Sequence, residues 1–178
     1  LYKRDIELKK SRRRDGLRLP ELGMQDYEPV WKKMPAFTAS RTPETLDECW
    51  LLEHPRVFTQ GMNSKPEHLL EPGAIPVIQI VRGGQITYQG PGQLVVYLLL
   101  DLKRPGLCVR QLVTLLEQSV IDLLAEYDIP AAPQKDAPGV YVQCNGKIAA
   151  LGLRIKQGCC YHGLRLHVVM ELTPLRQL

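Results

Sequence analysis

Lys147 is the first residue whose type and setting suggest chemistry. It follows the turn-forming pair Asn145-Gly146 and begins an apolar stretch. A lysine at the lip of a pocket can stabilise a nearby thiolate, which is the nucleophilic form of cysteine. That role requires a cysteine close in space, whereas most single lysines are simply solvated. Lys147 is therefore a candidate catalytic residue whose role depends on what the fold brings beside it.

The segment 82–93, RGGQITYQGPGQ, is rich in glycine, which loses more backbone freedom on folding than any other residue. Its backbone N–H groups are suited to face a carbonyl or anionic ligand, with Arg82, Thr87, Tyr88 and Gln93 as further donors. The alternative is a long hairpin that needs glycine for positive φ angles. The segment lacks the GxGxxG spacing of dinucleotide sites and the GK[ST] of P-loops. Composition alone leaves both alternatives open.

His162 and the cysteines are weaker candidates. His162 precedes a glycine in a strand-like stretch, where it either donates to a ligand or serves as a structural histidine. Cys159 and Cys160 are adjacent, so on a strand they point to opposite faces, and nothing local marks either as activated. The five cysteines lack the CxxC spacing of metal sites, and in a chain without an export signal they indicate reduced thiols. We expect no metal site.

Composition indicates one globular domain over residues 24–178, because the 178-residue chain is 44% hydrophobic and 24% charged. Residues 1–23 hold eight Lys/Arg and four Asp/Glu, which equals the whole chain's net charge of +4. This basic arm either contacts an acidic partner or is a flexible, solvated extension, and we expect the latter. It gives no evidence that the folded body binds nucleic acid.

No apolar run reaches the roughly 18 residues that cross a bilayer. The first residues also lack the apolar core of a secretory signal. These features predict a cytoplasmic or organelle-matrix protein with no membrane partner.

Apolar spacing predicts helices over residues 27–40 and 109–127, the first kinked or shortened by Pro35. A short strand is expected from Trp50, followed by a loop through Gly61, and buried strands are expected at 76–81 and 94–102. The segment 129–139 is predicted to be a loop, followed by strands at 139–143, 147–155 and 161–169. Because strands and helices come in runs, the fold class is α+β with a mixed β-sheet.

Three motifs in order resemble those of the lipoyl(octanoyl) transferase family: RGGQITYQGPGQ, GKIAALGLRI and GCCYHGLRLHV. LEHPRVFTQG and APGVYV are also similar to family segments, and the match runs from about Gly23 to the last residue. The resemblance implies a mixed β-sheet with flanking helices, related to biotin and lipoate ligases. It implies no cofactor, because the acyl group arrives already activated.

The family transfers an octanoyl group through a cysteine thioester, with a lysine beside it, and Lys147 matches that lysine. The resemblance implies octanoyl-acyl carrier protein as donor. The implied acceptors are lipoyl domains of 2-oxoacid dehydrogenases and the glycine cleavage H protein. The location would be cytoplasmic, or the mitochondrial matrix in a eukaryote. The positions that match substrate-binding segments are Arg82, Gly83, Gly84, Gln85, Ile86, Thr87, Tyr88, Gln89, Ala150, Leu151, Gly152, Gly163, Leu164 and Arg165, with His162 as a further candidate.

Several positions depart from the family pattern. ELTPLRQL matches the lead-in to the family's NPCG-like motif, so the catalytic cysteine is expected just beyond Leu178, in a C-terminally truncated and catalytically deficient chain. Gln89 replaces a histidine; it still forms hydrogen bonds but cannot titrate near neutral pH. Arg165 and His167 replace small or amide residues and are expected to crowd or charge the pocket.

Two alternatives belong to other functional classes. A non-catalytic module that holds an acyl or lipoyl group fits the missing cysteine. An ATP-using biotin or lipoate ligase is disfavoured, because the sequence lacks the nucleotide-loop signature of such enzymes.

Overall fold

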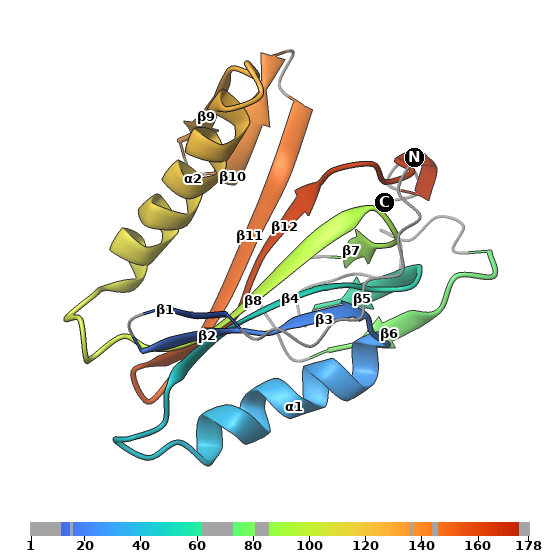
Figure 1. Cartoon of the computed structure of the whole chain (residues 1–178). Coiled ribbons are helices and arrows are strands. Elements are labelled where there is room, and N and C mark those ends of the chain that lie inside the picture. Colours follow the sequence, from blue (N-terminus) through green and yellow to red (C-terminus); the bar gives the residue numbers. More distant parts are fainter. Residues whose placement is uncertain are drawn as a thin grey trace.

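The computed structural model describes residues 12–14, 16–61, 73–80, 86–135, 137–143 and 146–174. In this part of the chain, nine strands form one large sheet, in the order β1-β2-β4-β8-β12-β11-β10-β9 with β3 also paired to β4 (Figure 1). A smaller sheet has the order β6-β5-β7. The elements are β1 (Arg12–Arg14), β2 (Leu17–Leu19), β3 (Glu21–Met24), α1 (Tyr27–Ala39), β4 (Asp47–Glu53), β5 (Val57–Gln60), β6 (Val77–Gln79), β7 (Ile86–Gln89), β8 (Gln93–Asp101), α2 (Val109–Ala125), β9 (Ala131–Gln134), β10 (Ala137–Val142), β11 (Gly146–Lys156) and β12 (Cys159–His167).

The large sheet is mixed, as predicted. β8 pairs antiparallel with both β4 and β12, whereas β2 and β3 run parallel to β4. Two helices with a mixed sheet confirm the α+β class.

The two helices cover opposite faces of the large sheet (Figure 1). Alternate residues of β8, Val95 and Tyr97 among them, pack with Val30 and Met34 of α1 in one apolar cluster. On the other face, Val120 of α2 belongs to a cluster with residues of β10, β11 and β12. This alternation follows from the two-residue period of a strand. It gives the sheet an α1 face and an α2 face.

Pro35 was predicted to kink or shorten the first helix, and the shortening does not occur. α1 continues to Ala39, four residues past Pro35, although proline cannot donate the hydrogen bond of that turn. The buried side chains of Val30 and Met34 hold the helix on the sheet, so packing outweighs the missing bond. The second helix, α2, matches its prediction to within two residues.

Two segments expected to be loops contain strands. Residues 131–134 of the predicted loop form β9, which lies at the edge of the large sheet and therefore tolerates Pro133. Residues 57–60, expected in the loop after β4, form β5, the central strand of the small sheet. The predicted buried strand at 76–81 is the short β6, where Val77 is 40% exposed.

The long hairpin between 76–81 and 94–102, one of the two alternatives for the glycine-rich segment, does not form in the described residues. β6 and β7 both pair with β5 in the small sheet, and β8 lies in the large sheet. The turn Gly90–Gly92 therefore links two sheets instead of closing a hairpin.

The described part of the basic N-terminal segment is not a loose extension. β1 and β2 form an antiparallel pair over residues 12–19, and β2 and β3 pair with β4. The charge count predicted exposure, but it carried no information about backbone pairing.

Candidate active site

Lys147 lies at the start of β11, where β10 positions its side chain. Its Nζ donates to the carbonyl oxygen of Pro138 at 3.3 Å and lies 5.1 Å from the centre of the Tyr141 ring. Gly139 has a φ of +142°, and a Cβ there would meet the Ala149 carbonyl oxygen at 2.6 Å and the Lys147 Cε at 3.2 Å. Glycine at this position leaves room for the lysine side chain.

Lys147 borders a cavity of about 280 Å³, which we call the Lys147 pocket. Its polar lining includes Lys147 and His167, and most of the rest is apolar. The lining residues are Val142, Gly146, Lys147, Ile148, His167, Val168, Met170 and Leu172. A mainly apolar cavity with a few convergent polar groups suits a hydrocarbon chain that carries one reactive end.

Strand alternation separates the predicted site residues into two groups. Leu151 and Leu164 pack in the cluster of α2, so their side chains lie on the α2 face. Ala150 and Arg165 are paired neighbours on β11 and β12, one position along from these leucines, and they lie on the opposite face. We call this opposite surface of β11 and β12 the site face. A ligand on the site face can therefore contact only the backbone atoms of Leu151 and Leu164.

The two glycines among these residues have different structural roles. A Cβ at Gly163 would collide with the carbonyl oxygen of Val96 on β8, so glycine is required for the pairing of β12 with β8. A Cβ at Gly152 would have only the Arg165 Nη2 within 4 Å, at 3.9 Å. Gly152 thus leaves open space on the site face, and Gly163 is explained by sheet packing.

The glycine-rich segment is described from Ile86 onward; Arg82, Gly83, Gly84 and Gln85 lie outside the described residues. Thr87 of β7 accepts a hydrogen bond from the Nη1 of Arg165 at 3.0 Å and contacts the Thr59 hydroxyl at 2.7 Å. This chain of polar groups joins β12 of the large sheet to β7 and β5 of the small sheet. Thr87 therefore lies beside the site face.

The turn after β7 is hydrogen-bonded to one wall of the Lys147 pocket. The carbonyl oxygen of Gly92 accepts hydrogen bonds from the N–H groups of Val168 and Val169 at 3.1 and 2.9 Å. A Cβ on Gly92, whose φ is +80°, would lie 2.7 Å from the Val169 carbonyl carbon. Glycine here permits a close approach of two backbone segments, one of which lines the pocket.

Ile86, Tyr88 and Gln89 are buried next to this wall. Ile86 and Tyr88 pack with Phe58, and Met170 of the pocket wall lies against the same cluster. Burial raises the pKa of the Tyr88 hydroxyl above its usual value. Gln89 is 1% exposed, and its Oε1 has no hydrogen-bond partner within the described structure. Ile86 and Tyr88 thus pack against Met170, a residue of the pocket wall.

His162 adopts a φ of +66°, which is uncommon for a residue other than glycine. Regular alternation would direct it to the α2 face, yet its ring lies 6.1 Å from that of Tyr97 and 5.2 Å from that of Tyr161. Both tyrosines belong to the cluster under α1. The left-handed backbone therefore turns His162 toward the α1 side of the sheet, where it is 5% exposed.

Sequence reasoning did not assign a role to His54, which is fully buried near the site face. Burial lowers the pKa of His54 to about 4, and the cation of Arg165 acts in the same direction. The ring is therefore neutral at physiological pH. Because the Gln25 carbonyl can only accept, Nδ1–H donates to it at 2.6 Å, and Nε2 accepts from the Tyr97 hydroxyl at 2.9 Å. Residues distant in sequence make these contacts, so no local pattern marks them.

His167 shares the Lys147 pocket. Burial lowers the pKa of His167, and the cations Arg165 and Lys147 lower it further, while a hydrogen bond with the Lys147 backbone opposes them. His167 is thus biased toward its neutral form. His167 is a polar residue in the lining of the Lys147 pocket, whereas Arg165 is not among the lining residues.

Cys159 and Cys160 lie at the end of β12 that pairs with the far end of β11 from Lys147. Cys159 pairs with Lys156 at the other end of β11, nine residues from Lys147, which corresponds to about 30 Å along the strand. Burial raises the pKa of Cys160 and of Cys49 to about 11, so both are thiols at neutral pH. Cys108 is exposed at the N-cap of α2. Cys144 lies outside the described residues.

Neither a metal cluster nor a membrane span occurs in the described ranges of the chain. These ranges contain no group of three or more His, Cys, Asp or Glu side chains that would hold a metal ion. None of their helices is both long and apolar enough to span a membrane.

Solved structures show which class of fold this is. The chain resembles a bipartite lipoate protein ligase from Thermoplasma acidophilum, with a TM-score of 0.68 and 15% identity over 86% of this chain and 62% of the other. It also resembles the biotin protein ligase of Aquifex aeolicus, with a TM-score of 0.53 and 16% identity over 89% of this chain and 56% of the other. At such identities the likeness establishes the fold alone, which is that of biotin and lipoate ligases.

Sequence relatives define the family more narrowly. The family described as lipoyl protein ligase A/B catalytic domain matches residues 26–178. The octanoyltransferase of Shewanella sp. strain ANA-3 is 59% identical over 162 residues, which cover 91% of this chain and 74% of the relative. That of Shewanella oneidensis is 58% identical over the same shares. The chain belongs to the octanoyltransferase family, a family of acyltransferases that act in protein lipoylation.

Proposed function

We propose that the protein moves an octanoyl group from octanoyl-acyl carrier protein to a lysine of a lipoyl domain. The acceptors are the lipoyl domains of 2-oxoacid dehydrogenases and the glycine cleavage H protein. The observation that carries the proposal is the placement of Lys147 at the rim of a mainly apolar cavity. That arrangement fits an acyl chain whose reactive carbonyl lies beside an ammonium group.

In this proposal the hydrocarbon chain lies along Ile148 and the wall residues Val168 and Met170. A cysteine thiolate attacks the donor thioester, and the carrier leaves as a thiol. The acceptor lysine amine then attacks the new thioester, which forms the amide and returns the thiolate. The Lys147 ammonium stabilises the thiolate and relays the protons of both steps.

The proposed nucleophile lies outside the described residues. Cys49 and Cys160 are buried with raised pKa values, and Cys159 is about 30 Å from Lys147 along β11. A group at such a distance cannot share an acyl intermediate with the lysine. The burial of Cys49 and Cys160 and the distance of Cys159 from Lys147 also support a second candidate function. This is a non-catalytic module that binds an acyl or lipoyl group without transferring it.

Mass spectrometry after incubation with octanoyl-acyl carrier protein tests the proposal. Two proteins are compared: the 178-residue chain, and the same chain extended by the C-terminal segment of the 59% identical Shewanella relative. We expect the extended chain to gain an octanoyl thioester on a cysteine of the added segment. Lys147→Ala in the extended chain should slow acylation by at least about 100-fold. Lys156→Ala, at the far end of the same strand, is the matched control and should not.

The outcomes separate the two candidates. Octanoylation of Cys49, Cys159 or Cys160 would contradict the placement of the nucleophile. An extended chain that binds the donor but never forms a thioester would favour the binding module. Equal slowing by Lys147→Ala and Lys156→Ala would remove the assigned role of Lys147.

A further inference from the structure

Lys147 contacts the peptide unit that joins Pro138 to Gly139 in β10. The carbonyl oxygen of Pro138 accepts a hydrogen bond from the Lys147 Nζ at 3.3 Å. At the other end of the same peptide unit, the N–H of Gly139 donates to the Oε1 of Glu117 on α2 at 3.0 Å. A carboxylate and an ammonium group thus bind the two ends of one peptide unit.

Gly139 lies in an irregular part of β10, where its N–H needs a partner outside the sheet. A shift of register between Ala137 and Val140 leaves the two residues between them out of the pairing with β9. A buried backbone donor without an acceptor is costly, so a side chain that accepts from Gly139 stabilises this part of the strand. Glu117 supplies that acceptor from the neighbouring helix.

The hydrogen bond from Gly139 to Glu117 also fixes the direction of the carbonyl that Lys147 contacts. A trans peptide unit is planar, and its C=O and N–H groups point in opposite directions. Proline restrains only its own φ, and glycine allows the unit to rotate, with a φ of +142° at Gly139. The contact with Glu117 therefore selects the orientation in which the Pro138 carbonyl points at Lys147.

The charges at the two ends match the dipole of the peptide unit. The Glu117 carboxylate lies at the positive N–H end, and the Lys147 ammonium lies at the negative C=O end. Hydrogen bonds arranged in such a chain strengthen one another. An ammonium group has three donors, so two remain for the thiolate and the substrate of the proposed reaction.

We propose that Glu117 is a positioning residue for Lys147. It orients the peptide unit between Pro138 and Gly139, whose carbonyl then holds the ammonium at the rim of the Lys147 pocket. Glu117 is not among the residues that line this pocket, so its effect on the reaction passes through the peptide unit. This inference rests on the proposed role of Lys147 in acyl transfer.

Substitutions of Glu117 separate the effect of the contact from that of the charge. Glu117→Gln keeps an oxygen at the same reach and loses the charge. Glu117→Asp keeps the charge but is one methylene too short for the contact, and Glu117→Ala loses both. Asp122→Ala is the matched control, because it removes an exposed carboxylate of the same helix that contacts Gln118.

The first measurement needs no catalysis and uses the 178-residue chain. Acetic anhydride is added at neutral pH, and mass spectrometry compares the acetylation of Lys147 with that of Lys156, which is exposed at the far end of β11. A hydrogen bond to a carbonyl favours the charged amine, which is not nucleophilic. We expect the relative rate at Lys147 to rise at least about threefold in Glu117→Ala and Glu117→Asp. Glu117→Gln and Asp122→Ala should leave it within about 1.5-fold.

The second measurement is the rate of thioester formation in the extended chain. Glu117→Ala should slow acylation by about tenfold, and Glu117→Gln should restore most of the rate. When Lys147 is already replaced by alanine, Glu117→Ala should cause no further slowing, because its effect depends on the lysine. Octanamide, an unreactive mimic of the octanoyl group, should bind Glu117→Ala as it binds the unsubstituted chain in titration calorimetry.

Several outcomes decide the inference. Circular dichroism confirms that each variant is folded, and the comparison of Glu117→Gln with Glu117→Asp is decisive if Glu117→Ala is not. Unchanged acetylation of Lys147 in Glu117→Asp overturns the inference. Further slowing by Glu117→Ala in the chain that lacks the Lys147 amine also overturns it, since a general structural role would then explain the effect.

The two measurements also separate this inference from the proposed function. If acetylation responds as expected but the extended chain forms no thioester, the orientation of Lys147 by Glu117 stands and the proposed function fails. If the thioester forms and Glu117→Asp changes neither acetylation nor acylation, the positioning role fails and the proposed function stands.

Discussion

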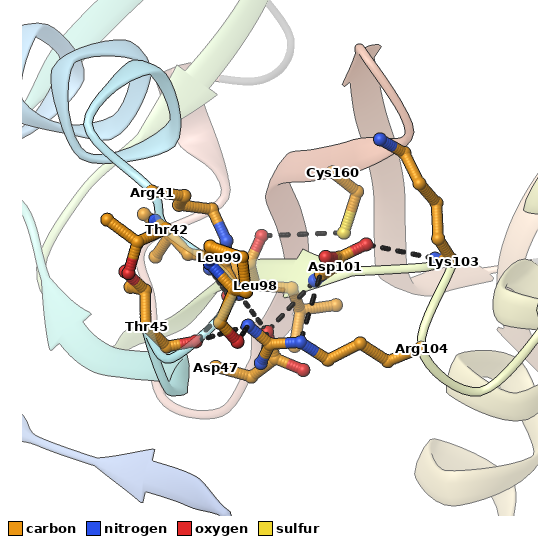
Figure 2. Close-up of polar contacts among 11 residues, drawn as sticks. Arg41, Thr42, Thr45, Asp47, Leu98, Leu99, Asp101, Lys103, Arg104 and Cys160 are labelled. Atoms are coloured by element: carbon orange, nitrogen blue, oxygen red, sulfur yellow. Dashed lines mark hydrogen bonds and ion pairs between the residues drawn. The ribbon is translucent and has the colours of Figure 1, made fainter.

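Arginine side chains have different partners at the two ends of the large sheet. At one end, Arg41 and Arg104 share the carboxylate of Asp47, and Arg104 also lies 3.7 Å from Asp101 (Figure 2). About 20 Å away along β8, Arg165 contacts Thr87, and no carboxylate in the described ranges pairs with it. We call the first group, Arg41, Asp47, Asp101 and Arg104, the Asp47 network.

The partners of the two arginines indicate different roles. Arg41, whose side chain is 6% exposed, also donates to the carbonyl oxygens of Leu99 and Thr45, so its charge and most of its donors are satisfied within the fold (Figure 2). Among the described residues, Arg165 donates to the neutral Thr87, and its Nη2 is the one atom within 4 Å of a Cβ built on Gly152. A satisfied buried cation is part of the structure, whereas one that lacks an anion is suited to a ligand.

Asp47→Asn should have the largest effect on stability. It leaves the Arg41 cation buried without its anion, and we expect the free energy of unfolding to fall by at least about 3 kcal/mol. Urea denaturation measures it. Lys32→Gln, which breaks an exposed ion pair with Glu28, is the control and should cost less than about 0.5 kcal/mol. Equal effects would contradict the structural role of the Asp47 network.

His54 should make the site end of the molecule sensitive to acid. Unfolded His54 binds a proton near pH 6.5, but the folded form does so only near pH 4. The unfolded state therefore binds more protons between these values, and stability should fall by about 3 kcal/mol as the pH drops from 6.5 to 4. Urea denaturation across this range measures the loss. In His54→Gln the slope should be shallower, and an unchanged slope would exclude His54 as its cause.

Gly92→Ala should disturb the pocket wall. The added Cβ meets the backbone of Val169 at 2.7 Å, and the φ of +80° is strained for alanine. We expect a loss of about 2 kcal/mol in unfolding experiments and weaker octanamide binding. Gly106 also has a positive φ, of +64°, but no atom lies within 4 Å of its Cβ position. Gly106→Ala should therefore cost only about 1 kcal/mol. Matching losses would show that strain, not contact, decides the effect.

Arg165→Gln should have the smallest effect on stability and is the direct counterpart of Asp47→Asn. It removes a cation that has no ion pair in the described residues, so the free energy of unfolding should change by less than about 1 kcal/mol in either direction. Urea denaturation at pH 7 measures it. A loss as large as that of Asp47→Asn would mean that Arg165 stabilises the fold. The arginines at the two ends of the large sheet would then have the same structural role.

Much of the fold was predictable because the strands and helices carry strong periodic signals. The residues of α2 and β8 have apolar side chains at the spacing that their burial requires, and both elements formed where predicted. β5 and β9 were missed. They are short, and they are strands because neighbouring backbone pairs with them, which a local sequence pattern cannot show.

The candidate site was predictable only in part. The motif order identified Lys147, and the structure places it at a pocket. Sequence also treated Leu151 and Arg165 alike, although strand alternation places their side chains on opposite faces of the sheet. The role of Gly163 in pairing with β8 likewise depends on a strand more than sixty residues away in the chain.

The order of the motifs and the alternation of apolar residues by themselves determined the family and the α+β class, since both are local properties of the chain. Only the tertiary structure decided which charges are satisfied. The carboxylate that neutralises a buried arginine comes from another strand, as Asp47 does for Arg41, and no sequence spacing reports that distance. The same physical reason applies to Arg165, whose lack of such a carboxylate in the described residues became visible only when β12, β7 and β11 were placed around it.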